Sequence, residues 1–228
     1  MSVHTVKAFD TEIGRLRGLI AEMGGLAEGA IERAMLALQR ADHGAARQVR
    51  EDDRRIDALA AEVERLAVQV IALRAPLAID LREVVAALKI AGVVERIGDY
   101  AKNIAKRVPQ IAGEEGGPRI EPVSTLPAMA RMAAAMVRAA LDAFAARDPV
   151  AAVRVCDSDT TLDDFYDSIF RTLVTYMVEN PRTITQVAHL LFVAKNLERI
   201  GDHATNVAEM VYFAATGSRL PERNRRDD

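Results

Sequence analysis

Several ordinary features are scarce in this 228-residue sequence. It has one cysteine, no tryptophan and only 4% aromatic residues, and its formal net charge is −3. A single cysteine, Cys156, cannot form an internal disulfide, so nothing indicates an oxidising compartment. The small negative charge, without a basic stripe interleaved with aromatic residues, argues against a nucleic-acid partner.

Long hydrophobic runs are also missing. The longest uncharged and strongly apolar run, residues 183–194, covers about a dozen residues, whereas a membrane-spanning helix needs roughly 20. The N-terminal segment carries charge but lacks the apolar region of a signal peptide. We therefore expect no direct membrane insertion and a cytoplasmic location.

Residues that favour helices are abundant. Half of the sequence is hydrophobic, and Ala, Leu, Val, Arg and Glu dominate it. Apolar residues recur at helical spacing, and no alternating pattern indicates a strand. Turn signals at Asp42–Gly44, Pro76, Asp148–Pro149 and Asn180–Pro181 separate the periodic segments. The predicted helices span 6–40, 45–73, 77–108, 126–147, 149–178 and 181–215.

The most informative feature is a sequence that occurs twice. The letters ERIGD occupy Glu95–Asp99 and again Glu198–Asp202, and an asparagine follows four residues after each Asp. A D-x-x-x-D pair precedes each copy. The same order of motifs in both halves indicates an internal duplication. The two acidic pairs are Asp53 with Asp57 and Asp159 with Asp163.

The duplication and the helix lengths together predict the architecture. Three long helices joined by short turns run up, down and up in a bundle. We therefore predict an all-α fold of two tandem antiparallel three-helix bundles related by internal duplication. The predicted bundles span 1–112 and 123–217, with a Gly- and Pro-rich linker at 113–122 and a polar tail at 218–228.

A helical wheel predicts which way the repeated carboxylates face. With Glu95 at zero, Asp99 falls near 40° and Asn103 near 80°, at about 100° per residue. The apolar residues of this helix cluster at roughly 160–220°. We therefore expect the acidic stripe to lie opposite the core, near the surface, and the same holds for the second copy. Asp53 and Asp57 are expected to face away from the apolar stripe of their own helix.

Two interpretations of these carboxylates are open. Acidic residues one turn apart are often an ordinary solvated surface paired with Lys or Arg. However, their recurrence in both halves favours a shared role. Two pairs on adjacent helices supply oxygen donors suited to hard cations. The candidate metal ligands are Asp53, Asp57, Glu95, Asp99, Asp159, Asp163, Glu198 and Asp202.

Three stretches give the sequence a resemblance to a known family. They are DDRRIDAL at Asp52–Leu59, the long segment Arg74–Ala105, and NLERIGDHATNVAE at Asn196–Glu209. In these stretches the chain resembles the PhoU family of phosphate-specific transport accessory and signalling proteins. The resemblance covers nearly all of residues 1–217, and the doubled ERIGD motif makes it specific.

The resemblance implies more than the residues themselves do. It implies divalent or ferric metal ions at the acidic motifs: iron, zinc, manganese or magnesium. It also implies negative regulation of the phosphate-starvation response, as a link between a phosphate ABC transporter and a sensor histidine kinase. The resemblance allows a homodimer as well.

Other functions have weaker support in the sequence. No Glu-x-x-His pair, P-loop or dinucleotide fingerprint occurs, so an enzyme is not predicted. A carboxylate-metal enzyme and a metal-free adaptor with acidic docking stripes remain the alternatives. We expect His189, in an apolar run, to be packed and hydrogen-bonded. Arg96 and Arg199 could compensate local charge, or contact phosphate or a partner carboxylate.

Overall fold

The computed structural model describes residues 3–112 and 124–221. Within these residues every regular element is a helix, which confirms the predicted all-α class. The predicted linker at 113–122 lies outside the described residues, and so does the tail beyond residue 221. The elements are α1 (Val3–Arg40), α2 (His43–Arg74), α3 (Ile79–Lys106), α4 (Val108–Ala112), α5 (Leu126–Ala146), α6 (Pro149–Glu179), η2 (Pro181–Thr183) and α7 (Ile184–Thr216).

The six long helices agree with the predicted ones, whereas the short α4 was not predicted. The third predicted helix ends at residue 108, yet Pro109 lies in the first turn of a further helix, α4. Proline is tolerated in a first turn, because the amide hydrogens there have no partner within the helix.

The turn between the first two helices of each bundle is built twice in the same way. Asp42 caps α2 by accepting a hydrogen bond from the amide of Ala45, 2.8 Å away. Asp148 caps α6 in the same way, accepting from the amides of Val150 and Ala151. A capping aspartate of this kind contributes about 1 kcal/mol. The residue before each cap is left-handed, with φ of 55° at Ala41 and 53° at Arg147.

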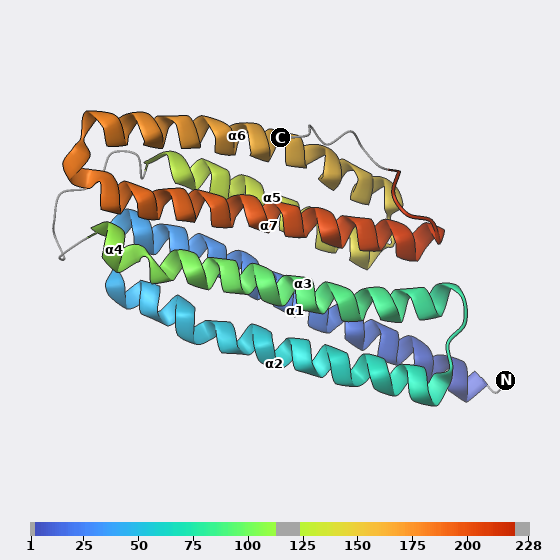
Figure 1. Ribbon diagram of the computed structural model, residues 1–228. Helices are drawn as coiled ribbons and strands as arrows, with labels where there is room; N and C mark the ends of the chain where they lie inside the picture. Colours follow the sequence, from blue (N-terminus) through green and yellow to red (C-terminus); the bar gives the residue numbers. More distant parts are fainter. Residues whose placement is uncertain (1–2, 113–123, 222–228) are drawn as a thin grey trace.

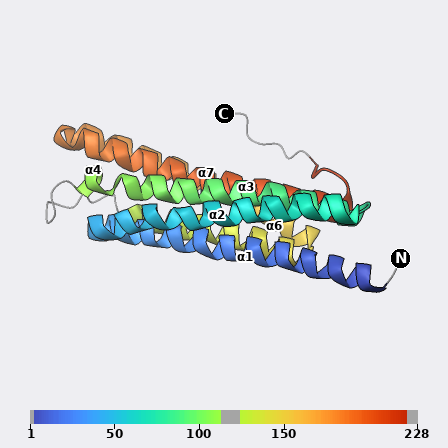
Figure 2. The ribbon, with the colours of Figure 1, turned by 90° about the horizontal axis from the view of Figure 1, so that it is seen from below.

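The two bundles pack side by side along their length (Figure 1). Helix α3 contacts α7 and α1 contacts α5, so the first and third helices of each repeat form the interface. Figure 2 shows the same helices after a 90° turn, running nearly parallel to one long axis. The buried residues of both bundles form one continuous hydrophobic cluster. The tandem bundles therefore share a core.

Packing explains two of the five letters in the repeated motif. Ile97 and Ile200 are completely buried. At Gly98 a Cβ atom would lie 2.9 Å from Ile56 of α2, and at Gly201 it would overlap Leu162 of α6. Glycine at these positions allows α2 to approach α3 closely, and α6 to approach α7.

A buried carboxylate ties the two bundles together, and no sequence pattern indicated it. Glu83, on α3, is buried. The Nε of Arg17, on α1, donates to Oε1 of Glu83 over 2.6 Å. Arg147, at the end of α5, donates to Oε2. One carboxylate therefore holds the guanidinium groups of both bundles.

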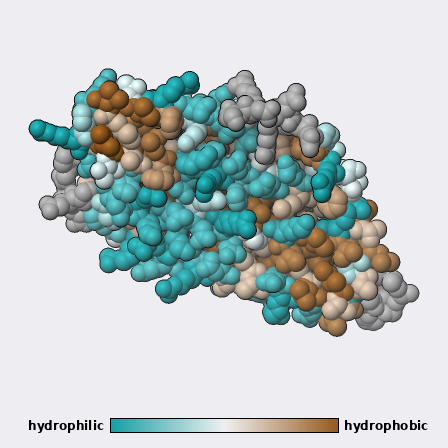
Figure 3. Space-filling view, in the orientation of Figure 1, coloured by the Kyte–Doolittle hydropathy of each residue, from teal (hydrophilic) through white to brown (hydrophobic). Residues whose placement is uncertain are grey.

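The exposed apolar side chains gather at two opposite ends of the molecule (Figure 3). One group is at the α2–α3 turn and consists of Leu73, Leu77, Ile79 and Leu81. The other is at the α6–α7 turn and consists of Phe170, Val174, Val178 and Ile184. We call these groups the α2–α3 tip and the α6–α7 tip. In the described chain no helix combines the length and hydrophobicity needed to cross a membrane.

The Glu83→Gln substitution tests whether this carboxylate joins the bundles. It should lower the free energy of unfolding by about 2 to 3 kcal/mol, because two guanidinium groups lose the charge that compensates them. Urea unfolding at pH 7 measures the change. Glu62, which pairs with Arg15 on the surface, provides the control. Glu62→Gln should cost about 0.5 kcal/mol or less, and equal losses in both variants would contradict the role of Glu83.

Candidate functional site

In each repeat the fold places the two predicted acidic pairs on neighbouring helices. In the first repeat, Asp53 and Asp57 lie on α2 and Glu95 and Asp99 lie on α3. Burial raises the pKa of Glu95, and the charges of Asp57 and Asp99 raise it further, against a lowering by Arg96. Burial also raises the pKa of Asp57, as does the charge of Asp53. The carboxylates therefore repel one another across one seam.

The prediction that this stripe faces away from the protein interior was wrong for Asp53. Asp53 is only 4% exposed, whereas Asp57 is exposed and Glu95 and Asp99 are half-buried. The reason is the close approach of α2 to α3: the Oδ1 of Asp53 lies 3.0 Å from where a Cβ of Gly98 would be. The acidic residues therefore line the α2–α3 seam, from its buried floor to its surface.

A lysine lies between two of these carboxylates. The Nζ of Lys102 donates to Oδ2 of Asp53 over 2.6 Å and to Oδ1 of Asp99 over 3.1 Å. These bonds, above all the one to Asp53, raise the pKa of Lys102, so its charge is permanent at neutral pH. The first repeat thus contains its own cation. Sequence reasoning missed it, although a lysine one turn after the acidic stripe was the available signal.

The second repeat has the same acidic residues in a different setting. Asp159 and Asp163 lie on α6, and Glu198 and Asp202 lie on α7. The position equivalent to Lys102 is Thr205, whose hydroxyl donates to the backbone oxygen of Asp202 over 2.6 Å. The lysine of this repeat, Lys195, lies three residues before Glu198.

That lysine satisfies only part of Glu198. The Nζ of Lys195 donates to Oε1 of Glu198 over 2.6 Å. The other oxygen, Oε2, is buried and has no hydrogen-bond partner in the described part of the chain. A buried carboxylate oxygen without a partner is costly, and a cation beside it would offset that cost. The donors in the second repeat therefore fit a hard cation.

The arrangement of side chains is nevertheless that of ion pairs. Among residues 3–112 and 124–221, no three His, Cys, Asp or Glu side chains converge closely enough to hold one ion. The candidate ligands face one another across each seam, but they are not gathered around a point. Metal binding therefore stays a prediction, based on the type of donor and on Glu198.

His189 is packed and hydrogen-bonded, as predicted. Its Nδ1 lies 2.9 Å from the guanidinium of Arg107, which also stacks 4.2 Å from the ring centre of Phe192. Because Arg107 can only donate, His189 accepts and is neutral. Burial lowers the pKa of His189, and the charge of Arg107 lowers it further.

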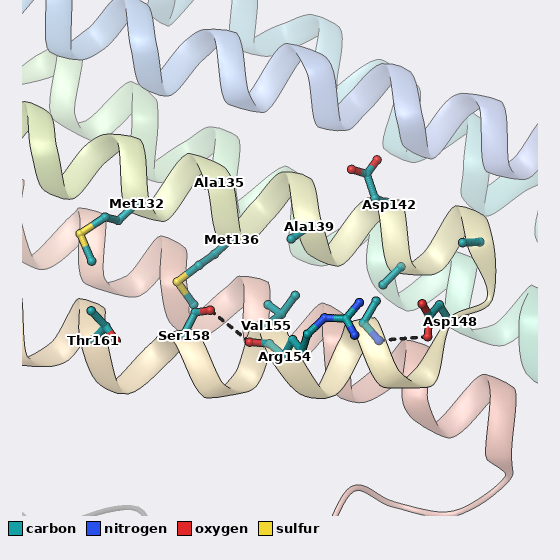
Figure 4. Close-up of a pocket in the computed structure, with 13 residues that line it drawn as sticks. Met132, Ala135, Met136, Ala139, Asp142, Asp148, Arg154, Val155, Ser158 and Thr161 are labelled. Carbon is teal, nitrogen blue, oxygen red and sulfur yellow. Dashed lines mark hydrogen bonds between the residues drawn. The ribbon is translucent and has the colours of Figure 1, made fainter.

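An open groove of about 690 Å³ lies between α5 and α6, apart from the acidic seams (Figure 4). Ala139 and Ser158 line it. The equivalent residues of the first repeat, Arg33 and Asp52, form an ion pair of 3.4 Å that joins α1 to α2. The second repeat therefore has a groove where the first has a charged pair.

These features define a class of protein: an internally duplicated, all-helical protein whose two three-helix bundles each carry an acidic seam. The family profile described as the PhoU domain matches this chain twice, at residues 20–108 and 126–211. The chain belongs to the PhoU family. The predicted resemblance is thereby confirmed, and the duplication is seen in the family match as well as in the fold.

Individual relatives agree with this assignment. A phosphate-specific transport system accessory protein PhoU homolog of Zymomonas mobilis is 55% identical over 225 residues, covering 99% of this chain and 94% of that protein. A homolog with the same description from Caulobacter vibrioides is 44% identical, covering 96% and 95%. These names describe accessory proteins of a transport system rather than enzymes.

Solved structures agree on the fold. The crystal structure of PhoU from Pseudomonas aeruginosa matches with a TM-score of 0.85 and 38% identity, covering 92% of this chain and all of that one. A phosphate transport system regulatory protein PhoU from Streptococcus pneumoniae matches with a TM-score of 0.84. Its 24% identity supports the fold alone.

Neutralising Glu95 should stabilise the protein. Its pKa is higher in the folded state than in the unfolded state, so the ionised carboxylate lowers the free energy of unfolding at pH values above the folded pKa. Below the unfolded pKa the carboxyl group is protonated in both states, and this loss of stability disappears. Glu95→Gln should therefore raise the free energy of unfolding at pH 7, by about 0.5 kcal/mol or less, and leave it unchanged below about pH 4. Urea unfolding at both pH values measures this, with the exposed Glu64→Gln as the control. A loss of stability at pH 7 would show that Glu95 is held by attraction instead.

Proposed function

We propose that this protein regulates phosphate uptake and the phosphate-starvation response as an adaptor between a phosphate ABC transporter and a sensor histidine kinase. In this role it keeps the response repressed when phosphate is plentiful. Membership of a family of phosphate-transport accessory proteins is the observation that carries the proposal. The adaptor would work in the cytoplasm, where the ATPase subunits of such a transporter act.

The two apolar tips support a role as an adaptor. Exposed clusters of large apolar side chains are typical of protein-docking surfaces. The α2–α3 tip and the α6–α7 tip lie at opposite ends of the long axis, so two partners could be bound without competing for one surface (Figures 1 and 3). We assign one tip to the transporter and the other to the kinase.

Leu77 and Val178 provide a matched pair of tests, because each is 76% exposed. Leu77→Asp and Val178→Asp should leave helicity and stability unchanged. Each should weaken binding to one partner by about tenfold or more, since a charge is introduced into an apolar contact. Binding of purified transporter ATPase subunit and of the kinase cytoplasmic region to each variant measures this. Unchanged binding of both partners in both variants would remove the tips from the proposal.

A metal ion on the acidic seams is the second part of the proposal. Glu198, which has a buried oxygen to satisfy, would be its first ligand in the second repeat, and Asp159 and Asp202 would have to turn toward the same ion. Carboxylates suit magnesium, manganese and iron, and the family resemblance adds zinc. A bound cation would neutralise the seam, whose carboxylates would then no longer repel one another. A homodimer is also part of the proposal, and sedimentation equilibrium tests it.

Elemental analysis of untagged protein, before and after chelation, tests the metal. We expect at least one tightly held ion per chain, lost in the Glu198→Gln/Asp202→Asn variant. That variant should remain folded, because both residues are only partly buried and the substitutions keep the size of each side chain. Glu64→Gln is the control and should retain the metal. Metal-free protein that still binds both partners would contradict the metal role and leave the adaptor role intact.

Lys102 favours one alternative. Its ammonium already bridges Asp53 and Asp99, so two of the four carboxylates of the first acidic seam have a counter-charge without a metal. The seams would then contact basic patches on partner proteins directly. Partner binding that survives chelation but falls in Glu95→Gln/Asp99→Asn would favour this metal-independent adaptor.

A further inference from the structure

The arginine of the repeated ERIGD motif lies outside the core, and one effect it has on an acidic seam is that the charge of Arg96 lowers the pKa of Glu95. The isoleucine is buried, the glycine allows two helices to meet, and the glutamate and aspartate line a seam. Arg96 and Arg199 are instead exposed. Neither takes part in an ion pair within the described chain. Packing does not require an arginine at either position, yet both repeats have one.

These arginines belong to the seam where the two repeats meet. Helices α3 and α7 lie side by side (Figure 1), and their equivalent residues Tyr100 and His203 are in ring contact. The two ring centres are 5.1 Å apart, and the rings cross at 86°. Because equivalent residues of the two repeats contact each other here, the pseudo-two-fold axis that relates the repeats passes close to this pair.

One of the two guanidinium groups contacts this aromatic pair, and the other residue, Arg96, lies one helical turn before Tyr100 on α3. The guanidinium of Arg199 is 5.9 Å from the ring centre of Tyr100. Burial lowers the pKa of His203, whereas a hydrogen bond to the backbone of Arg199 raises it. The positive charges of the Arg96 and Arg199 side chains also lower this pKa. Arg96, from one repeat, and Arg199, from the other, are therefore close enough to act electrostatically on the same ring.

Arg96 and Arg199 both carry a positive charge at this seam, and an anion bound there would be attracted by both. Guanidinium groups bind tetrahedral oxyanions with two parallel hydrogen bonds each. The cation–π contact with Tyr100 limits the orientations of the Arg199 guanidinium, which lowers the entropy lost on binding. Because both side chains are exposed, a dissolved ion can reach them.

We propose that Arg96 and Arg199 form a binding site for a tetrahedral oxyanion, inorganic phosphate, on the α3–α7 seam. The oxyanion chemistry follows from the two guanidinium groups. The choice of phosphate rests on the proposed function, because a regulator of phosphate uptake needs to detect this ion. The site lies between the two acidic seams, so bound phosphate would alter the charge of the face they share.

Calorimetric titration of the full, metal-free chain with inorganic phosphate tests the site. Removing the metal excludes binding through a metal ion. We expect the wild-type chain to bind, and Arg96→Gln and Arg199→Gln each to weaken binding by about tenfold or more, the loss expected for a charge-assisted hydrogen bond. The double variant should bind no phosphate. Arg54→Gln, at an exposed arginine of α2 that forms no ion pair in the described chain, is the matched control.

Several results would overturn the proposal. No binding by the wild-type chain would do so, as would equal binding by the double variant. Sulfate bound as tightly as phosphate would rule out phosphate as the specific ligand. Binding to phosphatidylglycerol vesicles, without binding to the free ion, would assign the arginines to a lipid headgroup instead.

A starvation-response reporter in cells separates this site from the proposed function. Repression by the wild-type chain, lost in the double arginine variant, would support both. Repression that persists in a double variant unable to bind phosphate would overturn the signalling role of the site and leave the adaptor function standing. Absence of repression by the wild-type chain would overturn the adaptor function, whatever the titration shows.

Discussion

The close approach of the second and third helices in each repeat determines where the charged groups of this protein lie. It depends on Gly98 and Gly201, where an added Cβ would collide with Ile56 and Leu162. Because α2 comes so near to α3, a carboxylate on the facing side of α2 is covered rather than solvated. Asp53 consequently requires a counter-charge, and Lys102 provides it from α3. The short distance between α2 and α3 therefore accounts for the acidic seam, for the repulsion among its carboxylates and for the lysine that compensates Asp53.

The duplication then arranges charge in bands across one face of the molecule. An acidic seam between α2 and α3 is followed by the arginines of the α3–α7 seam, and then by the acidic seam between α6 and α7. The apolar tips lie beyond these bands at the two ends of the long axis (Figure 3). Hydrophobic burial along α3 and α7 holds the bands in register, and Glu83 adds an ionic link between the bundles. Such a face can present several chemically distinct surfaces at once, as an adaptor requires.

The two repeats share a backbone plan but differ in how their polar groups are satisfied. Lys102 of the first repeat corresponds to Thr205, and Lys195 of the second corresponds to Gly92. The seam between α1 and α2 is joined by Arg33 and Asp52, whereas the corresponding groove between α5 and α6 is open. Symmetry in the fold therefore does not imply equivalent sites, and the partly unsatisfied Glu198 makes the second acidic seam the better candidate for a cation.

The sequence by itself determined the helices, their order and the duplication. These follow from local rules: apolar spacing, capping aspartates such as Asp42 and Asp148, and a motif repeated in both halves. It also paired the right acidic residues, because a short turn forces α2 and α3 to be neighbours. The partners named for the function came from family resemblance, since no local pattern encodes them.

Only the tertiary structure decided which of these groups are buried and what they contact. A helical wheel gives the direction of a side chain from its own axis, but it cannot say whether a neighbouring helix covers it, and so it misplaced Asp53. The lysine that compensates Asp53 is 49 residues away in the chain, and the arginines that hold Glu83 are 66 and 64 residues away. Such contacts depend on how closely the helices approach, which is set by the packing of the whole core.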